Sequence, residues 1–285
     1  MDWTEALNRA LDYIEDNLTE NINCSDIAKR AYVSCAHLQR GFYALTGITI
    51  GEYMRNRRLT LAGHELSAEN ARVIDVAMKY GYETPESFSK AFRRFHDVTP
   101  SRAKLYGVGL KSYNRLTVKI IMEGGSVMEY RIEKKDAFSV VVMARLFSGD
   151  NSVLSDSGIN VVPAFWGEYF SRGLAAAVPP DLGVCGETDP VSKAFRYGIG
   201  SFEEKVKNIP DGFEKWTIPA NTWAVFKCVG AMPDAILSMW KRIYGEWLPQ
   251  AKYELIQSYD FEYYTEGDLD SPDYVSEIWV PVREK

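Results

Sequence analysis

The sequence has few of the residues from which reactive or cross-linked sites are usually built. It holds 3 histidines and 4 cysteines in 285 residues, and no two cysteines stand in C-x-x-C spacing. This spacing indicates neither a zinc module nor a disulfide framework, so we expect free thiols in a reducing compartment. No apolar run is long enough to cross a bilayer, and the acidic N-terminus does not resemble a signal peptide. We expect a cytoplasmic protein without a membrane partner, metal or cofactor.

Charge is unevenly distributed along the chain. Residues 1–120 carry a net charge of +3 and residues 121–285 one of −9, within a total of −6. A chain of 285 residues is also longer than one hydrophobic core usually serves. We therefore expect two domains with different functions, over residues 1–108 and 128–285, joined by a linker over 109–127.

The first half contains an internal repeat. The segment "SDIAKRAYVSCAHLQRGFYALTGIT" from Ser25 matches "IDVAMKYGYETPESFSKAFRRFHDVT" from Ile74, with one extra residue in the turn of the second copy. Each copy indicates a short helix, a tight turn and a second helix, which is capped by Ser34 in the first copy and by Thr84 in the second. Because the second helix of such a unit fits the major groove, two units predict binding to two successive major grooves of double-stranded DNA.

Polar side chains on the second helix of each unit are the candidate DNA contacts. Gln39 can bond two edge atoms of adenine and Arg40 two of guanine, while small neighbours allow close approach. The alternative is an ordinary solvated helix face. The repeated turn, the caps and the basic second helix together favour DNA. The predicted set is Cys35, Ala36, Gln39, Arg40, Pro85, Glu86, Ser89, Lys90, Arg93 and Arg94.

The second half shows a weaker duplication, in which each copy is strand, strand, helix, strand and strand. The helices are "PAFWGEYFSRG" from Pro163 and "PDAILSMWKRIYGEWLP" from Pro233. Two such units side by side predict an α+β domain of sheet and helix with a central cleft.

Aromatic and acidic residues of this half are candidates for the cleft. Glu262 shares a strand face with Tyr264, and Glu277 shares one with Trp279. Aromatic walls around a carboxylate bind lipophilic cations through cation–π attraction, desolvated area and countercharge. The alternative, core aromatics with edge-strand glutamates, fits the pattern equally well. The predicted effector site is Trp166, Tyr197, Trp223, Glu262, Tyr264, Glu277 and Trp279.

Residues 1–108 resemble the AraC/XylS-type DNA-binding domain, an all-α fold of seven helices with two helix–turn–helix units. The segments that carry the resemblance are "IAKRAYVSCAHLQRGF", "GITIGEYMRNRRL" and "IDVAMKYGYETPESFSKAFRRFHDVTPSRAK". By position, the resemblance implies base-edge contacts for Ala36, Gln39 and Arg40. It implies contacts to bases or phosphates for Pro85, Glu86, Ser89 and Lys90.

Residues 128–285 resemble the GyrI-like effector-binding domain, through "IPANTWAVF", "IYGEWLP", "DFEYY" and "EIWVPV". The resemblance implies an acidic ligand contact in the pocket, with the C-terminal Glu-x-aromatic beside it. Together the two halves have the domain order of a Rob-like regulator. This order implies a transcription regulator that binds DNA and a small, lipophilic, cationic effector, with RNA polymerase as a further partner.

Two other functions stay open at this point. Some GyrI-like proteins are hydrolases, and Glu262 with Glu277 could form an acid–base pair. No nucleophile–base motif accompanies them, and all three histidines, at 37, 64 and 96, lie in the first half. The other alternative is a protein-docking module, which a shallow cleft would favour. We predict a regulator without enzymatic activity or catalytic residues.

Overall fold

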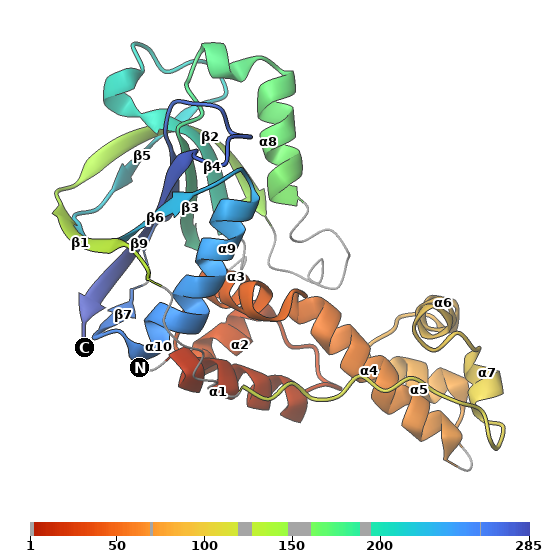
Figure 1. Ribbon diagram of the computed structural model, residues 1–285. Coiled ribbons are helices and arrows are strands. Elements are labelled where there is room, and N and C mark those ends of the chain that lie inside the picture. Colours follow the sequence, from red (N-terminus) through yellow and green to blue (C-terminus); the bar gives the residue numbers. More distant parts are fainter. Residues whose placement is uncertain (1–2, 69–70, 119–126, 148–160, 189–194, 257) are drawn as a thin grey trace.

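The structure is a computed structural model that describes residues 3–68, 71–118, 127–147, 161–188, 195–256 and 258–285. A helical part lies against a larger part that is built on one β-sheet (Figure 1). The helical part contains α1 (Trp3–Asp16), α2 (Cys24–Ala31), α3 (Cys35–Thr46), α4 (Ile50–Ser67), α5 (Val73–Lys79), α6 (Pro85–His96) and α7 (Pro100–Ala103).

The two predicted helix–turn–helix units are formed by α2 with α3 and by α5 with α6, and the long helix α4 links them. The predicted caps are confirmed, because Ser34 accepts the backbone N–H of His37 at 3.2 Å and Thr84 that of Ser87 at 3.1 Å. Pro85 occupies the first turn of α6, where its missing N–H costs nothing. Phe88 and Phe92 on the apolar stripe of α6 are fully buried against the other helices.

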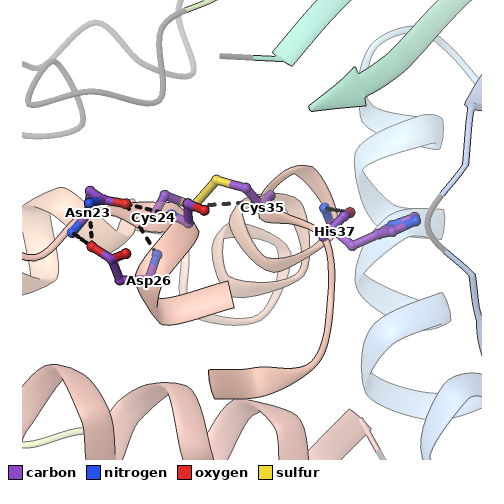
Figure 2. The surroundings of a disulfide bond; sticks show 7 residues. Asn23, Cys24, Asp26, Cys35 and His37 are labelled. Atoms are coloured by element: carbon purple, nitrogen blue, oxygen red, sulfur yellow. Dashed lines mark hydrogen bonds between the residues drawn. A yellow bond between two sulfur atoms is a disulfide. The ribbon is translucent and has the colours of Figure 1, made fainter. Parts of the chain in front are cut away.

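A disulfide between Cys24 and Cys35 joins the first residues of α2 and α3 (Figure 2). The expectation of free thiols is therefore wrong for these two residues, and it holds for Cys185 and Cys228, which are free and buried. The bonded residues are 11 positions apart in the sequence, a spacing that matches no motif. The turn between α2 and α3 brings their Cα atoms to 5.8 Å, a distance that a disulfide can span.

The second part is a nine-stranded sheet whose strands run in the order β1-β6-β9-β8-β3-β4-β2-β5, with β7 paired to β9. The strands are β1 (Tyr130–Lys135), β2 (Phe138–Phe147), β3 (Leu182–Thr188), β4 (Phe195–Phe202), β5 (Glu214–Ile218), β6 (Asn221–Val229), β7 (Tyr253–Leu255), β8 (Asp260–Tyr264) and β9 (Val275–Glu284). The helical segments are α8 (Val161–Ser171), η2 (Leu174–Ala176), η3 (Glu203–Lys205), α9 (Asp234–Arg242), η4 (Ile243–Trp247) and α10 (Leu248–Gln250).

The predicted duplication is confirmed. One copy is β1, β2, α8, β3 and β4, and the other is β5, β6, α9, β8 and β9, with the short β7 added before β8. The first strand of each copy pairs with the other copy, β1 with β6 and β5 with β2. The strand order is symmetric: read from either end of the sheet, corresponding strands of the two copies appear in the same order. The pair at the centre of the sheet is therefore β3 of one copy and β8 of the other.

The two parts of the chain share one hydrophobic core. Trp3, Phe42 and Tyr53 from the helical part belong to the same buried cluster as Trp240 and Tyr244 from the sheet part. Figure 1 shows α3 directly below α9, the helix that separates it from much of the sheet. Among the described helices, none has the length and apolarity that a membrane span requires. The predicted domain boundaries at 108 and 128 stay predictions.

The described part of the predicted linker packs against the helical part. The backbone N–H of Tyr113 donates to Thr60 at 2.9 Å, and its carbonyl accepts from Arg57 at 2.7 Å. Leu116 and Val118 pack on the shared core. This segment therefore lies along α4 as part of the helical body (Figure 1).

Candidate functional site

A cavity of about 880 Å³ lies where α3 meets the sheet part. Its walls come from α3 and the start of α4, from α8 and α9, and from the central strands β3 and β8. The volume is in the range of sites for small organic molecules. The side chains discussed below that line it are Gln39, Arg40, Trp166, Tyr197, Trp240, Glu262 and Tyr264.

Glu262 on β8 is held by two donors inside this cavity. It accepts from the Nε1–H of Trp240 at 2.8 Å and from the hydroxyl of Tyr264 at 2.8 Å. Trp166 stands edge-on to Tyr264, with ring centroids 5.2 Å apart, and donates its Nε1–H to the hydroxyl of Tyr197 at 3.1 Å. Burial, with the Glu262 carboxylate, raises the pKa of both tyrosines, so their hydroxyls stay neutral donors. The cavity therefore combines aromatic walls with the Glu262 carboxylate, and Asp181, Glu266 and Asp270 also line it.

Glu277 and Trp279 lie on the opposite face of the sheet. In the pairing of β8 with β9, Glu277 is opposite Tyr263, whereas Glu262 is opposite Ile278. Successive residues of a strand point to opposite faces, so the two glutamates are separated by the sheet. The expectation that Glu262 and Glu277 share one cleft is therefore wrong, and the acid–base pair of a hydrolase is not formed between them.

The face that carries Glu277 is an aromatic core with a charged edge. The Glu277 carboxylate accepts from the Nε1–H of Trp279 at 2.9 Å and from Arg131 at 2.7 Å. Trp223 is fully buried there, with its ring centroid 6.1 Å from that of Trp279. Of the seven residues predicted for the effector site, the structure thus brings four together in the cavity. The other three form a separate group.

Arg40 of α3 extends into the interface between the two parts of the chain. Its Nη1 donates to Asp260 at 2.5 Å, and its guanidinium lies over the ring of Trp240, 4.2 Å from the ring centroid. The Arg40 side chain is 22% exposed and that of Asp260 is 4% exposed. A buried carboxylate needs such a partner, so this ion pair fixes α3 against the sheet part.

His37, one turn before Arg40, reinforces the same contact. Its Nδ1 is 3.0 Å from the hydroxyl of Tyr244, and its Nε2 is 3.8 Å from the Asp260 carboxylate. Burial lowers the pKa of His37 to about 4, because the effect of Arg40 adds to it and that of Asp260 only partly opposes it. The imidazole is therefore neutral at pH 7.

Gly41 allows α3 to pack this closely. A Cβ atom at this position would lie 2.2 Å from the ring of Trp3 and 2.9 Å from that of Tyr244. These two rings themselves contact each other, with centroids 4.8 Å apart. Any larger residue would have to displace a buried ring, so the tight fit of α3 depends on a missing side chain.

Two of the candidate base contacts of α3, Cys35 and Arg40, are engaged within the protein in this conformation. Arg40 is paired with Asp260, Gln39 lines the cavity, and Cys35 is buried in the disulfide. Ala36 lies within α3, and its side chain is outside the part of the chain that the structure describes. Among the described side chains of α3, the exposed one is Thr46.

The corresponding helix of the second unit, α6, presents its polar face to solvent. Glu86, Lys90 and Arg93 are exposed, as is Arg94, while Ser89 is half-buried. Figure 1 shows α6 projecting away from the sheet part, at the far end of α4. The two helix–turn–helix units thus differ in access, although both have the predicted local structure.

Comparison with known families matches both parts of the chain. The family described as "Integron-associated effector binding protein" matches residues 131–282, and a "Helix-turn-helix domain" family matches residues 27–104. The chain belongs to the integron-associated effector binding protein family. Its N-terminal part is an AraC-type DNA-binding domain, so the chain is a DNA-binding transcription regulator with a C-terminal GyrI-like effector-binding domain.

Similar curated proteins match the N-terminal part of the chain. The HTH-type transcriptional activator AarP of Providencia stuartii is 36% identical over 117 residues, which are 41% of this chain and 87% of AarP. The regulatory protein SoxS of Salmonella typhimurium is 37% identical, over 35% of this chain and 94% of SoxS. One name describes a transcriptional activator and the other a regulatory protein, in agreement with a regulatory function for this chain.

A solved structure resembles the effector-binding domain. It is described as SAV2435 bound to tetraphenylphosphonium, with 20% identity and a TM-score of 0.46. The match covers 55% of this chain and 94% of that one.

Several residues of the site were not predicted from the sequence. Asp260 stands two residues before Glu262 on the same strand, so strand alternation could have placed it on the cavity side. Trp240 lies on the predicted helix from Pro233, but the pattern gave no reason to select it over Trp247. His37 and Tyr244 meet only because α3 docks on η4, and no local pattern indicates this docking.

Proposed function

We propose that this regulator binds a small lipophilic cation in the cavity around Glu262 and reads two successive major grooves with α3 and α6. The observation that carries the effector proposal is a carboxylate between aromatic rings in a cavity of about 880 Å³. Rings attract a cation through their faces and supply apolar contact, while the carboxylate supplies the countercharge. RNA polymerase remains a predicted partner.

The direct test of the effector proposal compares two ions of the same shape and opposite charge. Tetraphenylphosphonium and tetraphenylborate present the same four phenyl rings around a positive or a negative charge. We expect the cation to quench tryptophan fluorescence through Trp166 and Trp240, which line the cavity. Equal binding of both ions would contradict the charge preference, and binding of neither would contradict the site.

The Glu262→Gln variant should bind tetraphenylphosphonium about 30-fold more weakly than the wild type. Removing one charge of a desolvated pair costs roughly 2 kcal/mol or more, and 1.4 kcal/mol corresponds to a tenfold change in affinity. The amide oxygen can still accept one of the two hydrogen bonds from Trp240 and Tyr264. Isothermal titration measures the two affinities.

Glu277→Gln is the matched control, because it removes the same charge from the opposite face of the sheet. Its affinity for the cation should stay within about twofold of the wild type, since the sheet separates Glu277 from the cavity and its carboxylate is already paired with Arg131. A loss in Glu277→Gln as large as that in Glu262→Gln would mean that total charge, and not the cavity, attracts the ion.

The exposed polar face of α6 supports DNA contact by the second unit. Lys90 and Arg93 stand one turn apart on this face, with Glu86 one turn before them. Basic side chains on a groove-sized helix neutralise phosphates and release counterions. The test of two-groove readout is selection from a random DNA pool, which should yield two conserved segments about one helical turn apart. A single conserved segment would favour binding through α6 alone.

The Arg93→Ala variant should bind all DNA sequences more weakly. Losing one phosphate contact should reduce the slope of log affinity against log salt concentration by about 1. Fluorescence anisotropy at several salt concentrations measures this slope. Lys215→Ala, which removes an exposed basic residue from the sheet part, is the control and should leave the slope unchanged. A sequence-specific loss in Arg93→Ala would instead assign this side chain to a base.

A further inference from the structure

Arg40 and the proposed effector would occupy neighbouring positions on one aromatic ring. The face of Trp240 carries the Arg40 guanidinium at 4.2 Å, and its Nε1–H donates to Glu262 at 2.8 Å. Both Arg40 and Glu262 line the cavity. The cavity therefore already contains one cation of the protein itself, which comes from the helix that is expected to contact DNA.

We propose that Arg40 is an internal occupant of the cation-binding cavity, so that a lipophilic cation opposes docking of α3 on the effector-binding domain and thereby favours DNA binding. This inference rests on the proposed cationic effector. It adds a regulation of that site. When no effector is bound, the Arg40 side chain lies at the cavity and keeps α3, the helix proposed to contact DNA, docked.

The charges at the site indicate that the effector and the Arg40 guanidinium disfavour each other. The Arg40 charge is held by Asp260, which is almost fully buried, so the pair has little solvent around it to screen a further charge. A cation that stacks on Trp240 near Glu262 places a like charge beside the guanidinium. Like charges in a desolvated site disfavour each other, so either the effector binds weakly or Arg40 leaves. Attraction to Glu262 and the rings favours the effector.

Release of α3 would change what the chain presents to DNA. In the docked arrangement α6 is exposed, and α3 is covered by α9, η4 and β3. Arg40 cannot bond a base while it is paired with Asp260. An undocked α3 would supply the second reading helix. Linkage then requires the effect to be reciprocal: if the cation increases DNA affinity, DNA increases cation affinity by the same factor.

The test uses the full chain and two DNA duplexes. The first is the duplex selected as described above. The second is the same duplex with the base pairs that α3 is proposed to contact scrambled. Tetraphenylphosphonium should increase affinity for the selected duplex about tenfold, a typical allosteric coupling, and leave the scrambled duplex unchanged. Tetraphenylborate should have no such effect on either. Hydrogen exchange of residues 35–46 should accelerate when the cation binds, because α3 loses its cover.

The Asp260→Asn variant tests the coupling independently of the cavity, because Asp260 is paired with Arg40 but does not line the cavity. This variant should bind the selected duplex more tightly than the wild type without cation, and the cation should then add less. Glu203→Gln is the matched control: it removes one negative charge from an exposed pair with Lys215 and should behave as the wild type. Circular dichroism confirms that both variants fold.

The outcomes separate this inference from the effector proposal. If tetraphenylphosphonium does not bind, the proposed effector and this inference both fail. If it binds while exchange of α3 and affinity for DNA stay unchanged, the effector site stands and the coupling is wrong. The wild-type exchange measurement needs no variant, so a folding defect in Asp260→Asn does not affect it.

Discussion

The Arg40→Met variant is expected to lose about 3–5 kcal/mol of the free energy of unfolding, because it leaves a buried carboxylate without its partner. Methionine keeps an apolar chain of similar length over Trp240, so the lost interaction is mainly the ion pair with Asp260. Urea denaturation measures the loss. The stability of the docked chain should depend on this one pair more than on any exposed pair.

Adding Asp260→Asn to Arg40→Met should restore much of the loss, because a neutral amide is far less costly to bury unpaired than a carboxylate. The double-mutant cycle then gives an interaction energy that the single variants cannot. Arg283→Met is the control, since its exposed pair with Glu254 at 2.6 Å should contribute about 0–1 kcal/mol. Equal losses in Arg40→Met and Arg283→Met would show that the interface pair does not hold α3.

The secondary structure of this chain could be predicted from local signals. Thr84 with Pro85 marks the start of α6, and Ser34 marks the start of α3, because capping is a local interaction between a side chain and the next turn. The strand duplication was also visible, since each copy repeats the same order of elements. These signals depend on residues that lie within a few positions of each other.

The faces of the sheet were predicted only in part. Alternation correctly pairs Glu262 with Tyr264, and it pairs Glu277 with Trp279. Alternation within each strand does not show whether the two pairs lie on the same face of the sheet, because that depends on the register of β8 against β9. A shift of one residue would have joined the two glutamates, so the error comes from register and not from the strand pattern.

The docking of α3 could not be predicted from its sequence. A helix face with Gln39 and Arg40 is equally suitable for DNA and for a buried acidic partner. The deciding residues, Asp260 and Tyr244, lie more than 200 positions away along the chain. The Cys24–Cys35 disulfide is a similar case, because it depends on the turn that brings α2 and α3 together.

Under the proposed function, α3 would have two roles that exclude each other in space, contact with DNA and docking on the effector-binding domain. Arg40, which is predicted to contact a base, is the side chain that pairs with Asp260 of the effector-binding domain. A chain with two helix–turn–helix units can tolerate this arrangement, because α6 stays exposed while α3 is docked. On this proposal, the exposed unit would keep the protein on DNA through phosphate contacts, whatever state α3 adopts.

Acid is expected to weaken this interface through His37. Its pKa is about 4 in the folded chain and near 6.5 when unfolded, so the unfolded state binds the proton more readily between these values. The stability that the neutral imidazole contributes is fully present above about pH 6.5 and is lost as pH falls toward 4. A shift of this size corresponds to about 3 kcal/mol, of which roughly 2 kcal/mol is lost by pH 5.

The His37→Gln variant isolates this contribution from the carboxylates that also titrate in acid. Glutamine can bond Tyr244 but cannot take up a proton, so its stability should fall less than that of the wild type between pH 7 and pH 5. The charged groups facing His37 are Arg40, which opposes protonation, and Asp260, which favours it. His96→Gln is the control for a buried histidine outside the interface, since its pKa is also lowered by burial. The protection factors of residues 35–46, in which the intrinsic pH dependence of amide exchange is divided out, should fall toward pH 5 in the wild type and in His96→Gln, and much less in His37→Gln. The same pH dependence in all three proteins would show that protonation of His37 does not weaken the interface, and that acid acts elsewhere in the chain.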